Sequence, residues 1–265
     1  MLKAILYYIL LIAEFVFTLL VSGFAVGLYL AVNSEKEPIT DKTTFINDSM
    51  CIAVCVSVLS MLIVWFTFYK AKFSKFSFGK VAPKARWKTS LFSCLPLFGF
   101  TLAYYAAMNL LHIHFLPKEM TEMNYLTFIP YAIVGSFFSA YVFYGAIQEE
   151  LIRCKKKKWV QLLTLCLMMF PASVLTVSEE GNISWEYLGI LGTLSTCYGF
   201  WIYGKTRSTI ILFLVYFTSN LAPSKIESTP LAILLTVIGL AITLLGFIVL
   251  DKELPHKITL EKDEI

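Results

Sequence analysis

The chain has 265 residues, of which 58% are hydrophobic and 15% are charged, and its mean hydropathy is +0.72. A soluble globular protein, with about 25% charged residues, is excluded because this chain has too few polar side chains to cover its surface. The net charge of +4 does not indicate nucleic-acid binding, because the basic residues lie in short clusters between long apolar runs. The composition therefore predicts a protein whose main partner is the lipid bilayer, and no nucleic acid.

Apolar runs long enough to cross a bilayer recur along the chain. A spanning helix needs about 20 apolar residues. Runs of this kind lie at residues 4–32, 49–69, 89–112, 126–147, 159–177, 185–203, 209–222 and 231–250. The seventh run is short, so we expect it to extend past Asn220 or to pack against other helices. The predicted fold is all-α, a polytopic bundle of about eight transmembrane helices.

The loops between these runs divide the basic residues unevenly. One side carries most of the lysine and arginine: Lys3, Lys70, Lys72, Lys75, Lys80, Lys84, Arg86, Lys88, Arg153, residues 155–158, Lys205, Arg207, Lys252, Lys257 and Lys262. The other side keeps only Lys36, Lys42, Lys118 and Lys225. Because cytoplasmic loops are enriched in basic residues, we expect both termini to lie in the cytoplasm.

Ionisable residues inside apolar runs are informative, because a charge at the bilayer centre costs at least about 2.5–3.5 kcal/mol. Glu14 lies in the first run, as either a proton or substrate partner or a hydrogen-bonding residue between helices. His112 and His114 are two residues apart and would face apart on a helix, which does not suit a metal site. The cysteines lack metal-ligand spacing beside a histidine and are expected to be small hydrophobes, in no disulfide: Cys51, Cys55, Cys94, Cys154, Cys166 and Cys197. We expect no metal and no cofactor.

The most unusual polar segment is Gln148-Glu149-Glu150-Leu151-Ile152-Arg153, at the predicted cytoplasmic end of the fourth helix. Glu149 and Arg153 are four residues apart, so we expect them to pair on one helix face. The alternative is a solvated helix end followed by a lysine run that contacts lipid headgroups.

A second polar cluster begins with the turn Tyr203-Gly204-Lys205-Thr206-Arg207-Ser208. The apolar helix after it carries Tyr216 and Asn220, which are four residues apart and share a face. A buried amide in lipid must find a hydrogen-bond partner. Asn220 therefore belongs either to a site or to a contact that holds two helices together.

Together the two clusters resemble the CPBP family, which includes the CAAX prenyl proteases and the Abi-type bacteriocin-processing or immunity proteins. The family motifs are E-E-x-x-x-R, F-x-x-x-H and H-x-x-x-N or D, the last after a turn similar to residues 203–208. Gln148, Glu149 and Arg153 stand at the first motif, and Tyr216 and Asn220 at the third. The second has no clear counterpart, because its position falls at either Glu180 or Val174, without a histidine.

The resemblance covers about residues 125–225 and implies a bundle of about eight membrane helices in a bacterial plasma membrane. We expect one integral membrane domain over residues 1–265. It would comprise N-terminal helices in residues 1–124, the CPBP-like core in 125–225, and the last helix with a cytoplasmic tail in 226–265.

The resemblance also implies an intramembrane endopeptidase, in which a glutamate and histidines activate water while asparagine and a histidine stabilise the oxyanion. Gln148 cannot accept a proton as a glutamate does. Tyr216 can donate a hydrogen bond to an oxyanion, but its ordinary pKa of about 10 prevents proton shuttling near neutral pH. No histidine lies between residues 115 and 255.

Three hypotheses follow. The chain is a catalytically degenerate family member, acting as an immunity, regulatory or scaffold protein on a membrane-embedded peptide or protein. Alternatively, it is an active glutamic endopeptidase using Glu149 or Glu150 with Tyr216 and Asn220. The third is a small transporter or channel subunit. The family resemblance requires Gln148, Glu149, Tyr216 and Asn220 to converge in one cavity.

Overall fold

The computed structural model describes residues 78–111, 125–174, 185–223, 226 and 228–257, with isolated positions between residues 9 and 63. In this part of the chain the structure is 88% helix and has no strand, which confirms the predicted all-α class there. Several expectations fall outside the described residues: those on Glu14, His112, His114, Glu180, Cys51 and Cys55, and almost all of runs 4–32 and 49–69.

The chain forms two compact units, each described by itself. The first comprises Met1–Phe73 and Lys118–Phe138, and its described helix is α5 (Tyr125–Phe138). The second comprises Ser74–Pro117 and Ser139–Ile265. Its helices are η2 (Pro83–Ala85), α3 (Arg86–Leu110), η3 (Ser139–Gln148), α6 (Glu149–Arg153), α7 (Lys158–Val174), α8 (Trp185–Thr206), α9 (Thr209–Asn220) and α10 (Thr229–Lys257).

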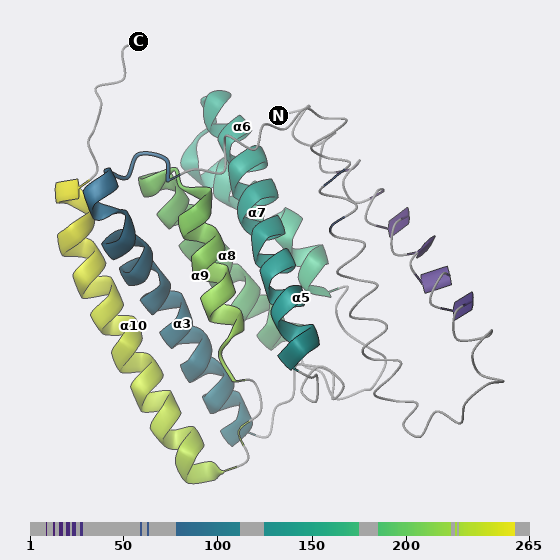
Figure 1. Ribbon diagram of the computed structural model, residues 1–265, viewed down its shortest axis with the longest axis vertical. Coiled ribbons are helices and arrows are strands. Elements are labelled where there is room, and N and C mark those ends of the chain that lie inside the picture. The colour runs from purple at the N-terminus through teal and green to yellow at the C-terminus, as the bar shows by residue number, and fades with distance from the viewer. Residues whose placement is uncertain are drawn as a thin grey trace. The chain divides into compact units, whose positions relative to one another are not determined.

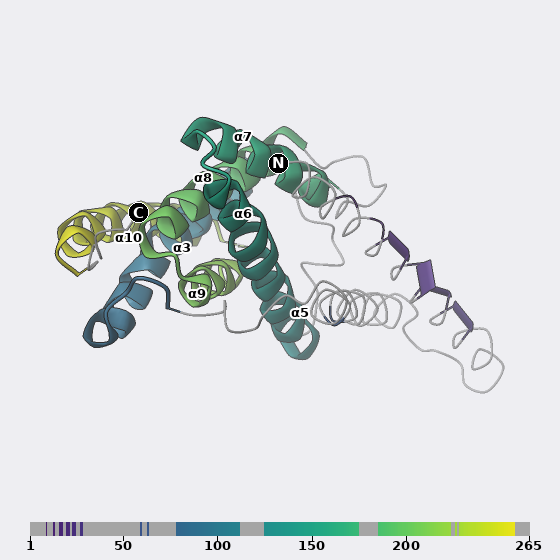
Figure 2. The ribbon, with the colours of Figure 1, turned by 90° about the horizontal axis from the view of Figure 1, so that it is seen from above.

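The helices of the second unit pack side by side, as Figures 1 and 2 show. Helix α3 lies between α10 and α9, α7 packs on α8, and η3 contacts both α8 and α9. The α3–α10 contact is close because small residues line it: a Cβ added at Gly239 would lie 2.6 Å from the backbone nitrogen of Ala103. Small residues let membrane helices approach through their backbones, where lipid supplies no hydrophobic force between them.

Among the residues that the structure describes, two helices are long and apolar enough to cross a membrane, Pro83–Leu110 and Thr229–Lys252. The second is the more informative, because only 17% of its most apolar stretch is buried. Its exposed side chains are large and apolar from end to end: Leu231, Ile233, Leu234, Val237, Ile238, Leu240, Leu244, Leu245, Phe247 and Ile248. A core helix of a soluble protein buries such residues, whereas lipid accepts them exposed. This supports membrane association, while the number of crossings stays a prediction.

The described cysteines take part in no disulfide. Cys94 is buried, Cys166 and Cys197 are partly buried, and Cys154 is exposed. The expectation of small apolar residues fits Cys94 best, and it is wrong for Cys154, which lies in the turn after α6.

Candidate functional site

Gln148 and Glu149, at the first motif, stand where η3 ends and α6 begins. The ten residues of η3 form a π-helix, a rare conformation that is frequent at functional sites. Tyr144 and Gln148 both face α8: the Tyr144 hydroxyl oxygen lies 3.4 Å from the carbonyl oxygen of Thr196, and the Gln148 amide donates to the carbonyl of Phe200 at 3.4 Å. The two η3 residues are four apart, and the two α8 carbonyls that they approach are also four apart in the same order. Helices η3 and α8 therefore run in the same direction.

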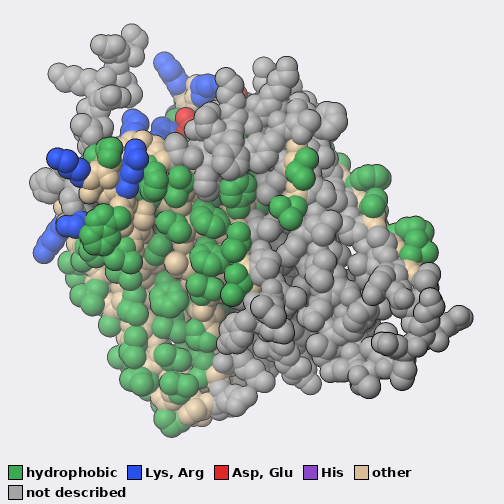
Figure 3. Space-filling model, viewed as in Figure 1, with side chains coloured by type: hydrophobic (Ala, Val, Ile, Leu, Met, Phe, Trp, Pro, Cys, Tyr) green, Lys and Arg blue, Asp and Glu red, His purple; other side chains and the backbone are tan. Residues whose placement is uncertain are grey.

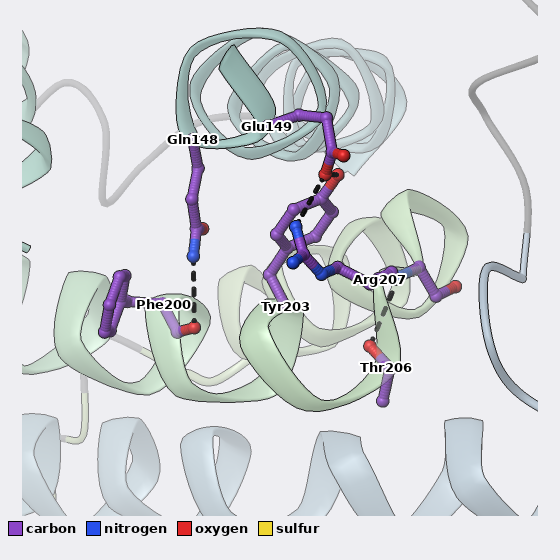
Figure 4. A network of polar contacts seen from close by, with 7 residues as sticks. Gln148, Glu149, Phe200, Tyr203, Thr206 and Arg207 are labelled. Atoms are coloured by element: carbon purple, nitrogen blue, oxygen red, sulfur yellow. Dashed lines mark hydrogen bonds and ion pairs between the residues drawn. The ribbon is translucent and has the colours of Figure 1, made fainter. Parts of the chain in front are cut away.

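The side chain of Gln148 is enclosed between these two helices and is 1% exposed (Figure 4). Its Nε2 makes only the long hydrogen bond to Phe200, and its Oε1 is buried with no hydrogen-bond partner in the described part of the chain. A buried acceptor left without a donor costs about 1–3 kcal/mol. Gln148 therefore contributes little to holding the helices together, and its buried amide oxygen is left without a donor among the described residues.

Glu149 pairs with the turn between α8 and α9, far along the sequence. Its Oε2 accepts hydrogen bonds from the Tyr203 hydroxyl at 2.9 Å and from Arg207 Nη1 at 2.8 Å (Figure 4). The expected pairing of Glu149 with Arg153 is therefore wrong, because Arg153 pairs with Glu150 instead. The Arg153 side chain is 72% exposed and lies on the outer side of α6. Glu149 instead points toward α8 and toward Arg207, whose side chain is only 25% exposed.

The turn of residues 203–208 is built to present Arg207. The backbone carbonyl of Thr206 accepts a hydrogen bond from the backbone N–H of Lys80 at 2.8 Å. The Ser208 hydroxyl caps α9 by accepting a hydrogen bond from the backbone N–H of Ile211 at 3.1 Å. Arg207 has a φ of +52°, in the left-handed region that non-glycine residues rarely adopt. Such strain persists only where the surroundings determine it, and here the contact with Glu149 fixes the side chain.

Tyr216, at the third motif, is hydrogen-bonded inside the bundle. Its hydroxyl lies 2.5 Å from that of Tyr144 and donates to the carbonyl of Ser195 at 3.1 Å, and the two rings stack. Gly199 on α8 leaves room for both hydroxyls, because a Cβ there would lie 2.7 Å from Tyr144 Cζ. Sequence reasoning missed Tyr144, although it lies four residues before Gln148 and could have been found by that spacing.

Asn220 is not brought to this network. It is exposed at the last residue of α9, whereas Arg207, which holds Glu149, immediately precedes that helix. Eleven steps of about 1.5 Å separate the two ends of α9 by roughly 16 Å. The expected convergence of all four residues in one cavity is therefore wrong. Gln148, Glu149 and Tyr216 each contact α8. Asn220 lies at the far end of α9 from Arg207, the residue that holds Glu149.

The arrangement has clear chemical consequences. Each motif carboxylate is held by a guanidinium, Glu149 by Arg207 and Glu150 by Arg153. Within the described residues, no group of three or more His, Cys, Asp and Glu side chains is placed to hold a metal ion. Val174, one of the two positions for the second motif, is the last residue of α7. Within the described residues, both carboxylates next to Gln148 are engaged by arginines.

The ion pair of Glu149 yields a direct prediction. Glu149→Gln is expected to lower the free energy of unfolding by about 1 kcal/mol, because the Glu149 carboxylate accepts hydrogen bonds from two other segments, through Tyr203 and Arg207. Glu150→Gln makes the same change beside a largely exposed arginine and should alter stability by less than about 0.5 kcal/mol. Chemical unfolding in detergent micelles measures both, and equal effects would contradict the asymmetry of the two pairs.

Comparisons with protein-family models, with curated proteins and with solved structures found no match for this chain. Its function is therefore inferred from the motifs and from the geometry of the network around Gln148 and Glu149.

Proposed function

We propose that this chain is a multi-pass membrane protein without peptidase chemistry. It resembles the CPBP family at residues 148–153 and in the turn of residues 203–208, but it does not bring the third-motif residue Asn220 to the site. In this proposal it acts as an immunity, regulatory or scaffold protein by binding a membrane-embedded peptide or protein in a bacterial plasma membrane. The observation that carries the proposal is the state of Glu149, which is held by Arg207 and Tyr203 beside the uncharged Gln148.

The loss of proteolysis follows from what a general base requires. It must take a proton from water at the reacting bond, within hydrogen-bond reach. Gln148 has no basic atom for this purpose, and the carboxylates of Glu149 and Glu150 are occupied by arginines. The hydroxyl of Tyr216 is already shared with Tyr144 and Ser195. An active endopeptidase would need one of these carboxylates to be released.

The directions of the helices support the membrane part of the proposal. Helix α9 returns along α8, η3 runs parallel to α8, and α3 runs antiparallel to α10, as the close approaches of Gly246 to Pro96 and of Gly239 to Ala103 show. These are the directions that alternating membrane crossings require of the third, fourth, sixth, seventh and eighth predicted spans. The cytoplasmic position of both termini is part of the same proposal.

The proposal predicts that the purified protein does not hydrolyse peptides. Full-length chain in detergent or in nanodiscs is incubated with membrane-embedded peptides and with prenylated peptides, and the products are followed by mass spectrometry. We expect no cleavage above that of Glu149→Ala and Glu150→Ala variants prepared in parallel. Cleavage by the natural chain that either substitution abolishes would overturn the proposal and establish a glutamic peptidase.

A further inference from the structure

Four consecutive exposed lysines, residues 155–158, extend from the turn after α6 to the first residue of α7, and they are here called the basic turn. Figure 3 shows lysine and arginine side chains gathered at one end of the helices, above an apolar surface. Trp159 follows directly and is 63% exposed at the start of α7. At the start of α3, Trp87 is similarly exposed, with Lys88 Nζ 5.9 Å from its ring centroid. Tryptophan and lysine together are typical of membrane–water interfaces.

The basic turn has a fixed backbone. The N–H of Lys156 donates to the carbonyl of Leu151 at 3.2 Å, and the N–H of Lys155 donates to that of Ile152 at 2.8 Å. This is the Schellman pattern that ends a helix. The buried Gln161 then donates its side-chain amide to the carbonyl of Lys156 at 2.7 Å. The lysine side chains therefore start from defined positions.

Lys155 occupies a position that favours glycine. Its φ is +51°, and the residue at this place in a Schellman ending is usually glycine because a side chain costs free energy there. Glycine would suit this backbone better, so the lysine side chain stands here at a conformational cost. Strained non-glycine residues are often found at functional sites.

The charge of the basic turn is not balanced within the described chain. The two ion pairs of the described residues are Arg153–Glu150 and Arg207–Glu149, and neither includes a lysine of the basic turn. The neighbouring acid, Glu150, is already taken by Arg153. Four adjacent like charges repel one another, so an external anion would stabilise the turn.

An apolar stripe begins where the basic turn ends. Trp159, Leu163 and Leu167 are spaced four residues apart on α7, and they are 63%, 51% and 65% exposed. They therefore share one outward face. The order along this face is ammonium groups, an aromatic ring and then aliphatic side chains, which matches the order of phosphate, interface and acyl chain in a phospholipid. A free phosphate or an acidic protein would leave the stripe without a partner.

We infer that the basic turn and the stripe of Trp159, Leu163 and Leu167 form a binding site for an anionic phospholipid. The lysines contact the headgroup phosphate, and the stripe contacts an acyl chain. This inference depends on the proposed membrane placement of α7, but not on the CPBP resemblance or on the loss of proteolysis.

The test compares phosphatidylglycerol with phosphatidylcholine. Full-length protein in detergent micelles is titrated with each lipid, and bound lipid is counted by native mass spectrometry. Near a membrane surface each basic residue changes the affinity for anionic lipid by about fivefold. We expect phosphatidylglycerol to bind at least about fivefold more tightly than phosphatidylcholine. Replacing all four lysines of the basic turn by glutamine should abolish this preference, whereas replacing all four by arginine should retain it.

Lys155→Gly separates binding from folding. It fits the left-handed backbone, so the thermal midpoint should stay equal or rise, while affinity for phosphatidylglycerol falls by about fivefold. Equal binding of the two lipids, or an unchanged preference in the glutamine variant, would overturn the inference. So would displacement of phosphatidylglycerol by inorganic phosphate alone, which would identify a site for free phosphate. Peptide cleavage by the same preparation would overturn the proposed function and leave the lipid site standing.

Discussion

Gly199→Ala is expected to lower the free energy of unfolding by about 2–4 kcal/mol, although alanine is the better helix former. The new Cβ would lie 2.7 Å from Tyr144 Cζ and would overlap both tyrosine hydroxyls. Tyr144 and Tyr216 are buried with stacked rings, so neither can move aside without losing packing. The substitution also separates Tyr216 from the carbonyl of Ser195, a hydrogen bond worth about 1 kcal/mol.

Gly204→Ala is the matched control, because it makes the same change on the same helix with no atom within 4 Å of the new Cβ. It should leave stability unchanged or raise it slightly. Tyr216→Phe removes one of the crowded hydroxyls, so it should recover part of the loss when combined with Gly199→Ala. Thermal and denaturant unfolding in micelles measure the series, and equal behaviour of the two glycine variants would refute the close packing of η3 and α9 on α8.

Leu240→Lys is expected to reduce the amount of chain that is stably inserted in the membrane. Leu240 is exposed near the middle of α10, and a lysine at the centre of a membrane helix costs about 2.5–3.5 kcal/mol on insertion scales. Leu231→Lys makes the same change near the start of α10, where the ammonium group can reach the headgroups at little cost. Resistance of the chain to alkaline extraction from membranes measures both variants.

The two lysine variants distinguish a lipid-facing helix from a water-facing one. In lipid, the loss of insertion should be confined to Leu240→Lys. In water, a lysine at either exposed position would be tolerated and would increase solubility, so indifference to Leu240→Lys would contradict the membrane placement of α10.

The polar clusters were visible in the sequence because each is local. Residues 148–153 and the turn of residues 203–208 stand out as charged and hydroxyl groups beside apolar runs. The structure then joins them, through Glu149 and Arg207. Helical spacing pointed to Arg153 as the partner of Glu149, because spacing identifies candidates on the same helix only. A partner 58 residues away is selected by the packing of α6 against the end of α8.

Asn220 illustrates the same limit in the opposite direction. Its spacing from Tyr216 places both on one helix face, yet Tyr216 is buried and Asn220 is exposed where α9 ends. Periodicity describes the direction in which a side chain leaves its helix. It does not describe how far the neighbouring helices extend along that face. That extent decides which residues on the face are buried together.

By itself, the sequence determined that the chain is apolar enough for a bilayer, that the described part is helical, and which short segments carry the polar groups. These properties follow from composition and from periods of a few residues. Only the tertiary structure decided that Glu149 belongs to Arg207, that Tyr144 joins Tyr216, and that Asn220 lies apart. Such pairings depend on the register and direction of helices that are distant in the chain. The packing of a whole helix interface determines both.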